Sequence, residues 1–187
     1  MRNEWAAEGE VSGSSGVVAG GGVRRPSAIS LRDLRVNYGK FEAVKGISLL
    51  ENLCGPNKPL HQEAPDEKEF IGLVRSGNTR LKDALKEDLS LESRFDLAYN
   101  AGHALSLAAL RRRGYRSTNR YIVFQVLEQT LGLKPLVWRI LAKAHELRNL
   151  SEYEGALRIN EALVRDLINA VGAVSKAIQE KFNPQAR

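Results

Sequence analysis

The sequence predicts an all-α protein: an antiparallel up-and-down helical bundle, preceded by a disordered N-terminal extension and a short β-hairpin fragment. Two observations predict the bundle. Apolar residues recur every three to four positions in five segments after residue 66. Residues that start or stop helices separate these segments, among them Ser117, Gly132 and Pro135. No stretch after residue 66 alternates with the period of a strand, so only helices are expected there.

The composition is that of an aliphatic globular protein. Hydrophobic residues make up 43% of the 187 positions but aromatic residues only 6%, so aliphatic side chains must form the core. The net charge of +6 tolerates an anionic partner without requiring one. No apolar run approaches the roughly 18 residues that span a bilayer, so no membrane association is expected. The single cysteine, Cys54, and the absence of a signal-peptide pattern predict a cytoplasmic protein.

Two segments precede the predicted bundle of residues 51–187. Residues 1–28 contain Gly-Ser-Ser-Gly and a run of three glycines without any hydrophobic period, which predicts a disordered leader. Residues 29–50 begin with apolar positions at Ile29, Leu31, Leu34 and Val36, which predict a strand. A turn follows at 38–40, and a returning strand would complete a hairpin.

The segment 29–49 resembles the N-terminal start of an ABC-transporter ATPase of the branched-chain amino-acid type. In that resemblance, Tyr38 holds the position of an aromatic residue that stacks on adenine. An ATPase also needs a glycine-rich loop that ends in Lys-Ser or Lys-Thr to hold the phosphates. The sequence that follows, Gly55-Pro56-Asn57-Lys58, has no second glycine before such a pair. ATPase activity is therefore excluded, and the segment is interpreted as a truncated or fused fragment.

The first two helices are predicted after a connector at 51–66, which contains three prolines. Asp66 and Glu69 form a capping box that starts a helix at about 66–87. The second helix, at about 91–113, ends at Gly114. Small residues along it allow a close approach of neighbouring helices; these are Ala98, Ala101, Gly102, Ala104 and Ala108.

Three more helices complete the predicted bundle. The third, at about 118–131, begins after Ser117 and ends at Gly132. The fourth runs from Pro135 to about residue 148. Ser151 and Glu154 form a second capping box, which predicts that the fifth helix, at about 152–181, begins there.

The stretch Leu147–Gly155 carries the candidate site. It places Arg148 and Asn149 just ahead of the predicted start of the fifth helix. Exposed backbone N–H groups at a helix N-terminus favour anions, so this pair predicts a place for a phosphate. On the chemistry alone a structural interpretation is favoured, in which Arg148 pairs with a glutamate and Asn149 caps a turn.

Two further side chains are expected to face the same cleft. Tyr153 lies one helical turn beyond Asn149, and His145 lies three residues before Arg148 on the preceding helix. An arginine and a histidine in one cleft could stabilise a phosphorane and move a proton during RNA cleavage, in which the 2′-hydroxyl attacks. The candidate catalytic residues are therefore Arg148, Asn149, Tyr153 and His145.

A basic cluster at the end of the second helix is the candidate nucleic-acid surface. Its arginines are interleaved with Tyr115 and Tyr121, and arginine with aromatic side chains is typical of such surfaces. A solvated helix end that complements the helix dipole explains the cluster equally well. The cluster consists of Arg111, Arg112, Arg113, Arg116 and Arg120.

No metal or cofactor site is expected. The three histidines, His61, His103 and His145, have no cysteine or carboxylate at ligand spacing. His103 lies among core positions of the second helix and is predicted to be a packed residue. Cys54 has no neighbouring histidine or helix terminus that would activate it as a nucleophile.

The chain resembles the HEPN-domain family over about residues 51–182, and is closest to a small, mostly uncharacterised bacterial branch. Several short segments carry the resemblance by their order and spacing. They are Ser93-Arg94-Phe95-Asp96-Leu97-Ala98-Tyr99-Asn100-Ala101, Ala108-Ala109-Leu110, Arg113-Gly114-Tyr115-Arg116, Thr130-Leu131-Gly132-Leu133 and Arg148-Asn149-Leu150-Ser151-Glu152-Tyr153-Glu154-Gly155.

The resemblance implies an up-and-down helical bundle, commonly a homodimer whose motif residues face each other across a cleft. Many members cleave RNA without a metal, as toxins of toxin–antitoxin pairs or in phage defence. Others bind nucleotides or act as non-catalytic partners of a minimal nucleotidyltransferase. The nuclease branch uses an arginine, a polar residue and then a histidine; Arg148 and Asn149 match the first two. Tyr153 holds the histidine position, and tyrosine titrates near 10.

The predicted function is therefore RNA or nucleotide binding, with metal-independent ribonuclease activity as one form of it. The alternative is a regulatory partner module of a nucleotidyltransferase, in which Tyr153 is a modification target.

Overall fold

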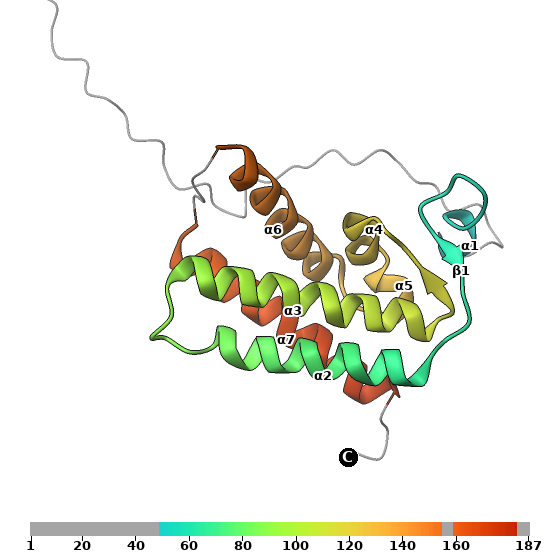
Figure 1. Cartoon of the computed structure of the whole chain (residues 1–187), viewed down its shortest axis with the longest axis horizontal. Helices are drawn as coiled ribbons and strands as arrows, with labels where there is room; N and C mark the ends of the chain where they lie inside the picture. Colours follow the sequence, from blue (N-terminus) through green and yellow to red (C-terminus); the bar gives the residue numbers. More distant parts are fainter. Residues whose placement is uncertain (1–48, 155–158, 183–187) are drawn as a thin grey trace, which may run out of the picture. The chain divides into compact units, whose positions relative to one another are not determined.

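The computed structural model describes residues 49–154 and 159–182, and for residues 151–154 it describes the backbone only. All of these residues belong to one unit, Glu42–Arg187. They form a mostly helical bundle with one two-stranded sheet (Figure 1), which confirms the predicted all-α class. The predicted leader and nearly all of the predicted hairpin lie outside the described residues. In chain order the elements are α1 (Leu49–Asn52), β1 (His61–Gln62), α2 (Glu67–Ala84), α3 (Leu91–Arg112), β2 (Tyr115–Arg116), α4 (Arg120–Gln125), α5 (Leu127–Leu131), α6 (Pro135–Glu154) and α7 (Glu161–Phe182).

Helices α2 and α3 form a hairpin, and each of them begins at a side-chain cap. The Asp66 carboxylate accepts a hydrogen bond from the backbone N–H of Glu69 at 2.8 Å, as the predicted capping box requires. Ser90 caps α3 in the same way. The two helices pack closely because Gly77 faces Leu105: a Cβ atom at position 77 would lie 2.6 Å from the Leu105 Cγ.

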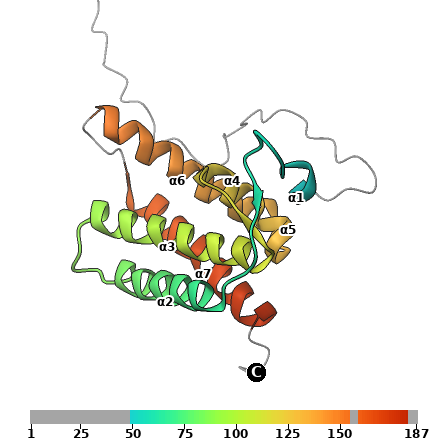
Figure 2. The same ribbon diagram turned by 45° about the vertical axis from the view of Figure 1, so that its right-hand side comes forward.

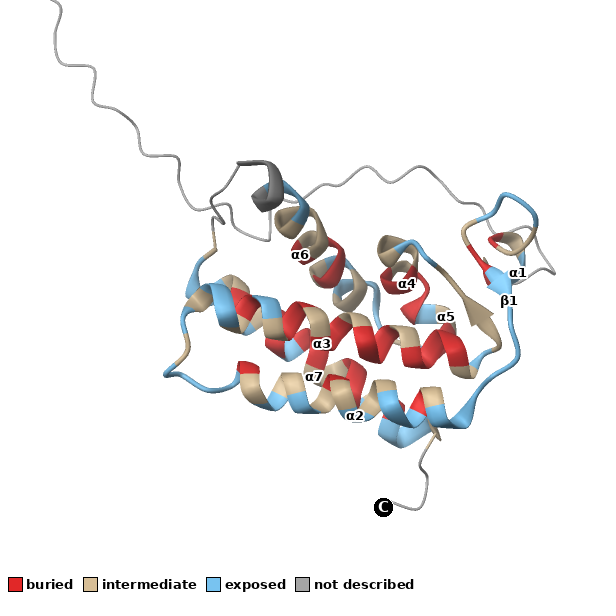
Figure 3. Ribbon diagram, in the orientation of Figure 1, coloured by how far each residue is buried: buried red, intermediate tan, exposed pale blue. Residues whose placement is uncertain are grey.

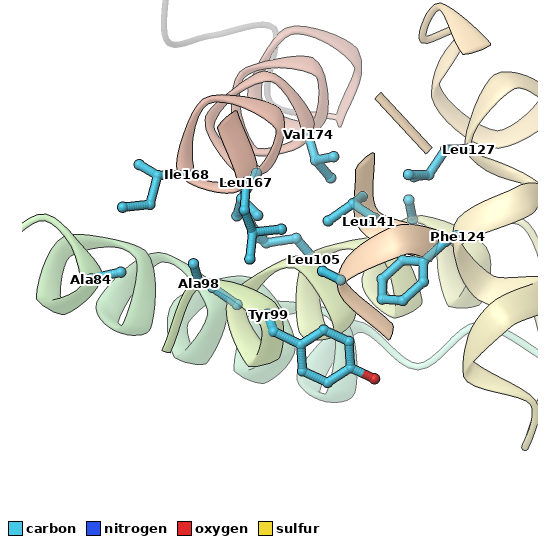
Figure 4. Close-up of a cluster of buried hydrophobic side chains, with 14 of the residues drawn as sticks. Ala84, Ala98, Tyr99, Leu105, Phe124, Leu127, Leu141, Leu167, Ile168 and Val174 are labelled. Atoms are coloured by element: carbon cyan, nitrogen blue, oxygen red, sulfur yellow. The ribbon is translucent and has the colours of Figure 1, made fainter. Parts of the chain in front are cut away.

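Helix α3 is the centre of the bundle. It contacts α2, α4, α5, α6 and α7, and most of its length is buried (Figure 3). The apolar stripe of α7 packs against α3, with Leu167, Val171 and Val174 fully buried. Figure 4 shows Leu167 and Val174 with Leu141 of α6 and Leu127 of α5, and one core joins the six helices α2 to α7.

The predicted third helix is two helices. α4 ends at Gln125 and α5 begins at Leu127, with Val126 between them outside regular helical geometry. Its predicted cap is also wrong: Asn119 caps α4 by accepting from the Ile122 N–H, whereas the Ser117 hydroxyl donates to the Pro59 carbonyl at 2.8 Å. Gly132 ends α5 in the left-handed region, as predicted.

The predicted boundary between the last two helices is wrong. Helix α6 continues without interruption through Ser151 to Glu154, so the Ser151–Glu154 pair does not start a helix. Asn160 is the true cap of α7, because its side chain accepts from the backbone N–H of Leu163 at 2.9 Å. Arg148 and Asn149 consequently lie in the last third of α6 and not ahead of a helix N-terminus.

The predicted connector at 51–66 contains structure of its own, and a short strand occurs after residue 66. Gln62 and His61 pair antiparallel with Tyr115 and Arg116 (Figure 2). Strands of two residues are too short to leave an alternating pattern in the sequence. A second apolar cluster lies beside this sheet; it contains Leu50, Leu53, Leu60, Leu110, Val123 and Val126. Helix α1 thus extends the bundle two residues ahead of the boundary predicted at residue 51.

Candidate functional site

Polar side chains from α3, α4 and α6 gather around the ring of Tyr99. Figure 4 shows this ring at the edge of the core, beside Phe124 and with its hydroxyl directed away from the apolar side chains. The set contains two arginines, two histidines, one amide and two aromatic rings. We call it the Tyr99 cluster; it consists of Tyr99, His103, Arg120, Phe124, His145, Arg148 and Asn149.

Helical spacing brings these side chains to one place. Tyr99 and His103 are four residues apart on α3, so they share one face of that helix. His145, Arg148 and Asn149 share one face of α6 for the same reason. The packing of α4 against both helices then adds Arg120 and Phe124.

Hydrogen bonds hold the His145 ring at both nitrogens. Its Nδ1 lies 2.9 Å from the hydroxyl oxygen of the fully buried Tyr99. Its Nε2 lies 3.3 Å from Nδ2 of Asn149. Tyr99 and Asn149 thereby hold the imidazole ring in one orientation.

Two guanidinium groups lie on the Tyr99 ring. The Cζ atoms of Arg148 and Arg120 are 5.1 Å and 5.9 Å from its centroid, within the range of cation–π attraction. Arg120 Nη1 also donates to the Tyr99 hydroxyl at 3.5 Å. At the rim, Arg148 Nε is 3.8 Å from a carboxylate oxygen of the exposed Asp96. The cluster thus brings two positive charges to one ring, and Asp96 is a carboxylate that lies beside Arg148.

His103 lies next to these charges and is neutral at physiological pH. Burial lowers the pKa of its imidazole to about 4, and the positive charges of Arg120 and Arg148 contribute to the same shift. Its ring meets Phe124 edge-on with 6.0 Å between centroids. His103 is therefore a packed residue, as predicted, and it also lies beside the two arginines.

The predicted catalytic set is brought together in part. His145, Arg148 and Asn149 meet on α6. They lie within this helix and not at the helix N-terminus that the sequence predicts. The backbone of Tyr153 lies further along the same helix, and its side chain lies outside the described residues. The structural alternative for Arg148 is also partly present, with Asp96 as the paired carboxylate in place of a glutamate.

The predicted basic cluster needs a correction at Arg111. Its side chain is 1% exposed, and it cannot reach a ligand at the surface. Arg111 Nε donates to Glu69 at 2.8 Å, and its two terminal nitrogens donate to the carbonyls of Glu63 and Ala64. Arg111 therefore joins α3 to α2 and to the strand segment as a structural residue.

Three other members of that cluster also have partners within the fold. Arg112 pairs with Glu67, and Arg116 pairs with Glu63 and Glu69. Arg113 donates to the Thr130 carbonyl. Only Arg120 of the predicted set lies in the Tyr99 cluster, on a different face from the Glu63–Glu69 network to which Arg111 and Arg116 belong.

Neither Tyr99 nor the position of His103 beside the two arginines was predicted from the sequence. Tyr99 belongs to the resemblance segment at 93–101, and His103 was predicted only as a packed residue. A signal was present: a tyrosine and a histidine four residues apart interrupt a face of small apolar residues on the second helix. Nothing in the sequence, however, indicates that α6 crosses that face.

Comparisons with known proteins bring no family to this chain: no family model, no curated protein and no solved structure matches it. Among the described residues, no three histidine, cysteine or carboxylate side chains are grouped so that they could hold a metal ion. In the same part of the chain, no helix is both long enough and apolar enough to cross a membrane.

Proposed function

We propose that this protein is a HEPN-type helical bundle that binds RNA or a nucleotide by placing a phosphate against the Tyr99 cluster. The observation that supports this most strongly is the pair of guanidinium groups, Arg120 and Arg148, on one buried tyrosine ring. Both positive charges lie within 5.9 Å of the centroid of the same ring, so they raise the local positive potential. An anion that binds beside them is attracted by both charges.

The donor set suits a phosphate. Guanidinium groups bind phosphate oxygens through paired N–H donors. The amide of the exposed Asn149 and the imidazole of His145 lie beside them and supply further hydrogen-bonding groups. Asp96 is 60% exposed, so an incoming anion can replace it at Arg148 without leaving a buried carboxylate.

Binding is tested by titrating the full chain, in EDTA, against a fluorescein-labelled single-stranded RNA and following fluorescence anisotropy. Arg120→Ala and Arg148→Ala should each weaken binding by roughly 10- to 100-fold, because each removes a charge-assisted hydrogen bond. Arg165→Ala, an exposed arginine of α7, is the matched control for loss of one charge. Equal affinities for all four proteins would contradict the proposed site.

Metal-independent RNA cleavage is a second candidate, favoured by the position of His145 beside Arg148. In this reaction the Asn149 amide leaves Nε2 of His145, which takes the proton of the attacking 2′-hydroxyl and returns it to the departing 5′-oxygen. The two arginines stabilise the phosphorane. The products are a 2′,3′-cyclic phosphate and a free 5′-hydroxyl.

Cleavage in EDTA should be abolished by His145→Ala, while RNA binding should weaken less than in Arg148→Ala, because the charge of Arg148 is kept. If a broad panel of RNAs stays intact with the wild-type protein, the non-catalytic partner role takes precedence. That role is checked by intact-mass measurement after incubation with a minimal nucleotidyltransferase: the mass should rise, and Tyr153→Phe should prevent the rise.

A further inference from the structure

A second group of side chains lies where α4 meets the first turns of α6. The rings of Tyr121 and Trp138 meet edge to face, with 6.5 Å between centroids and 85° between planes. The guanidinium of Arg139 lies over the indole, with its Cζ 5.8 Å from the ring centroid. Arg139 and the neighbouring Leu136 are exposed, Leu136 by 66%.

This aromatic group is continuous with the Tyr99 cluster along both helices. On α6, Trp138 and His145 are seven residues apart on one face, which places them about 10 Å apart along the helix axis. On α4, Arg120 and Tyr121 are adjacent: Arg120 reaches the Tyr99 ring and Tyr121 reaches Trp138. The first turn of α4 therefore connects the two groups, and a ligand that lies across it touches both.

We propose that Trp138 is a base-stacking position, and that the ligand of the Tyr99 cluster is single-stranded RNA and not a free mononucleotide. The inference rests on the proposed phosphate site. Single-stranded nucleic acids bind where cationic side chains follow the backbone and aromatic rings stack with bases. Here Arg120 and Arg148 provide the first part, and Trp138 with Arg139 provides the second.

The surrounding residues fit these roles. Tyr121 has its hydroxyl oxygen buried and its ring packs edge to face with the indole, so in this proposal Tyr121 does not itself meet a base. Trp138 is half-buried and packs against the core through part of its ring. Arg139 is exposed, so its guanidinium can move from the indole face to a backbone phosphate when a base stacks there.

The test uses Trp138 as its own reporter. The chain has two tryptophans, Trp5 and Trp138, so Trp5→Phe leaves Trp138 as the only indole. Titration with oligoadenylate of two to eight nucleotides should quench its fluorescence to saturation, and affinity should rise from mononucleotide to the longer chains. Inorganic phosphate should bind without quenching.

Substitution then separates stacking from packing. Trp138→Leu keeps an apolar side chain without a π face, and should weaken oligoadenylate binding by about 5- to 100-fold while leaving the affinity for inorganic phosphate unchanged. Trp138→Phe should lose less. Thermal unfolding of each variant shows whether it remains folded. The affinities of Trp138→Leu are compared with those of the wild type once the variant is shown to be folded.

Each outcome decides the inference. Unchanged oligoadenylate affinity in Trp138→Leu, or equal affinity for mononucleotide and oligonucleotide, overturns it. If Arg148→Ala still weakens binding in that case, the phosphate site stands and only the stacking position fails. If neither phosphate nor oligoadenylate binds the wild-type protein, the proposed function and this inference fail together.

Discussion

At the scale of single residues, Tyr99 combines the roles of a core residue and a polar anchor. Its ring is fully buried against Phe124, and its hydroxyl meets His145. A buried hydroxyl without a partner would cost about 1–3 kcal/mol, so the position of His145 is coupled to the packing of the core. This coupling explains how the half-buried His145 of α6 is held in one orientation.

His103 makes a pH prediction. Its pKa in the fold, about 4, lies below the ordinary value of 6.5, so the folded state favours the neutral imidazole. Its contribution to stability is therefore complete above pH 6.5 and is lost as pH falls towards 4, because the unfolded chain then takes up a proton that the folded chain does not. Between pH 7 and pH 5, the wild-type protein should lose about 1 kcal/mol more free energy of unfolding than His103→Gln.

Urea unfolding at the two pH values measures this difference. His61→Gln, which removes an exposed histidine of β1, is the control and should behave like the wild type. Equal pH dependence of the wild type and His103→Gln would show that His103 titrates normally in the fold.

At the scale of elements, two glycines of α2 should respond in opposite directions to the same change. A Cβ atom at Gly77 would lie within 3 Å of two Leu105 atoms, so Gly77→Ala should destabilise the protein by about 1–3 kcal/mol. Gly72 faces open space, so Gly72→Ala should stabilise it by about 1 kcal/mol through helix propensity alone. Chemical unfolding of both variants checks the pair, and stabilisation by both would show that α2 and α3 are not in such close contact.

The same two helices show what the sequence predicts well. Asp66 and Gly114 lie at the predicted ends of the α2–α3 hairpin because local hydrogen bonds and backbone conformation decide those ends. The start of α7 was misplaced for a local reason too. Ser151 and Glu154 match a capping box, but no glycine or proline precedes them to stop α6, and helix-forming residues continue through the motif. Asn160 caps α7 instead. A single asparagine in a sequence is a weaker signal of a helix start than a complete capping box such as Ser151–Glu154.

At the scale of the whole molecule, the Tyr99 cluster could not be predicted because its members meet only through packing. Tyr99 and His145 are 46 positions apart in the chain, and they touch only because α3 and α6 pack against each other. The position of His145 beside Arg148 followed from helix spacing, whereas Tyr99, His103 and Arg120 required the arrangement of α3 and α4. The same limit applies to Arg111: an arginine triplet at a helix end looks solvated until α2 and the strand segment cover one of its members.

The extent of the folded unit gives the last prediction. Leu50 and Leu53 are buried in the second apolar cluster, beside Leu60 and Val123, so α1 belongs to the bundle. Truncation of residues 1–48 should leave the thermal unfolding temperature nearly unchanged, because every buried residue described here is retained. Truncation of residues 1–53 removes both leucines and should lower that temperature by on the order of 10 °C, given the cost of emptying a buried leucine site. Circular dichroism melting curves compare the two proteins. A large drop for the shorter truncation would show that the segment 29–48 is integrated into the bundle, and equal temperatures for both would show that α1 contributes nothing to its stability.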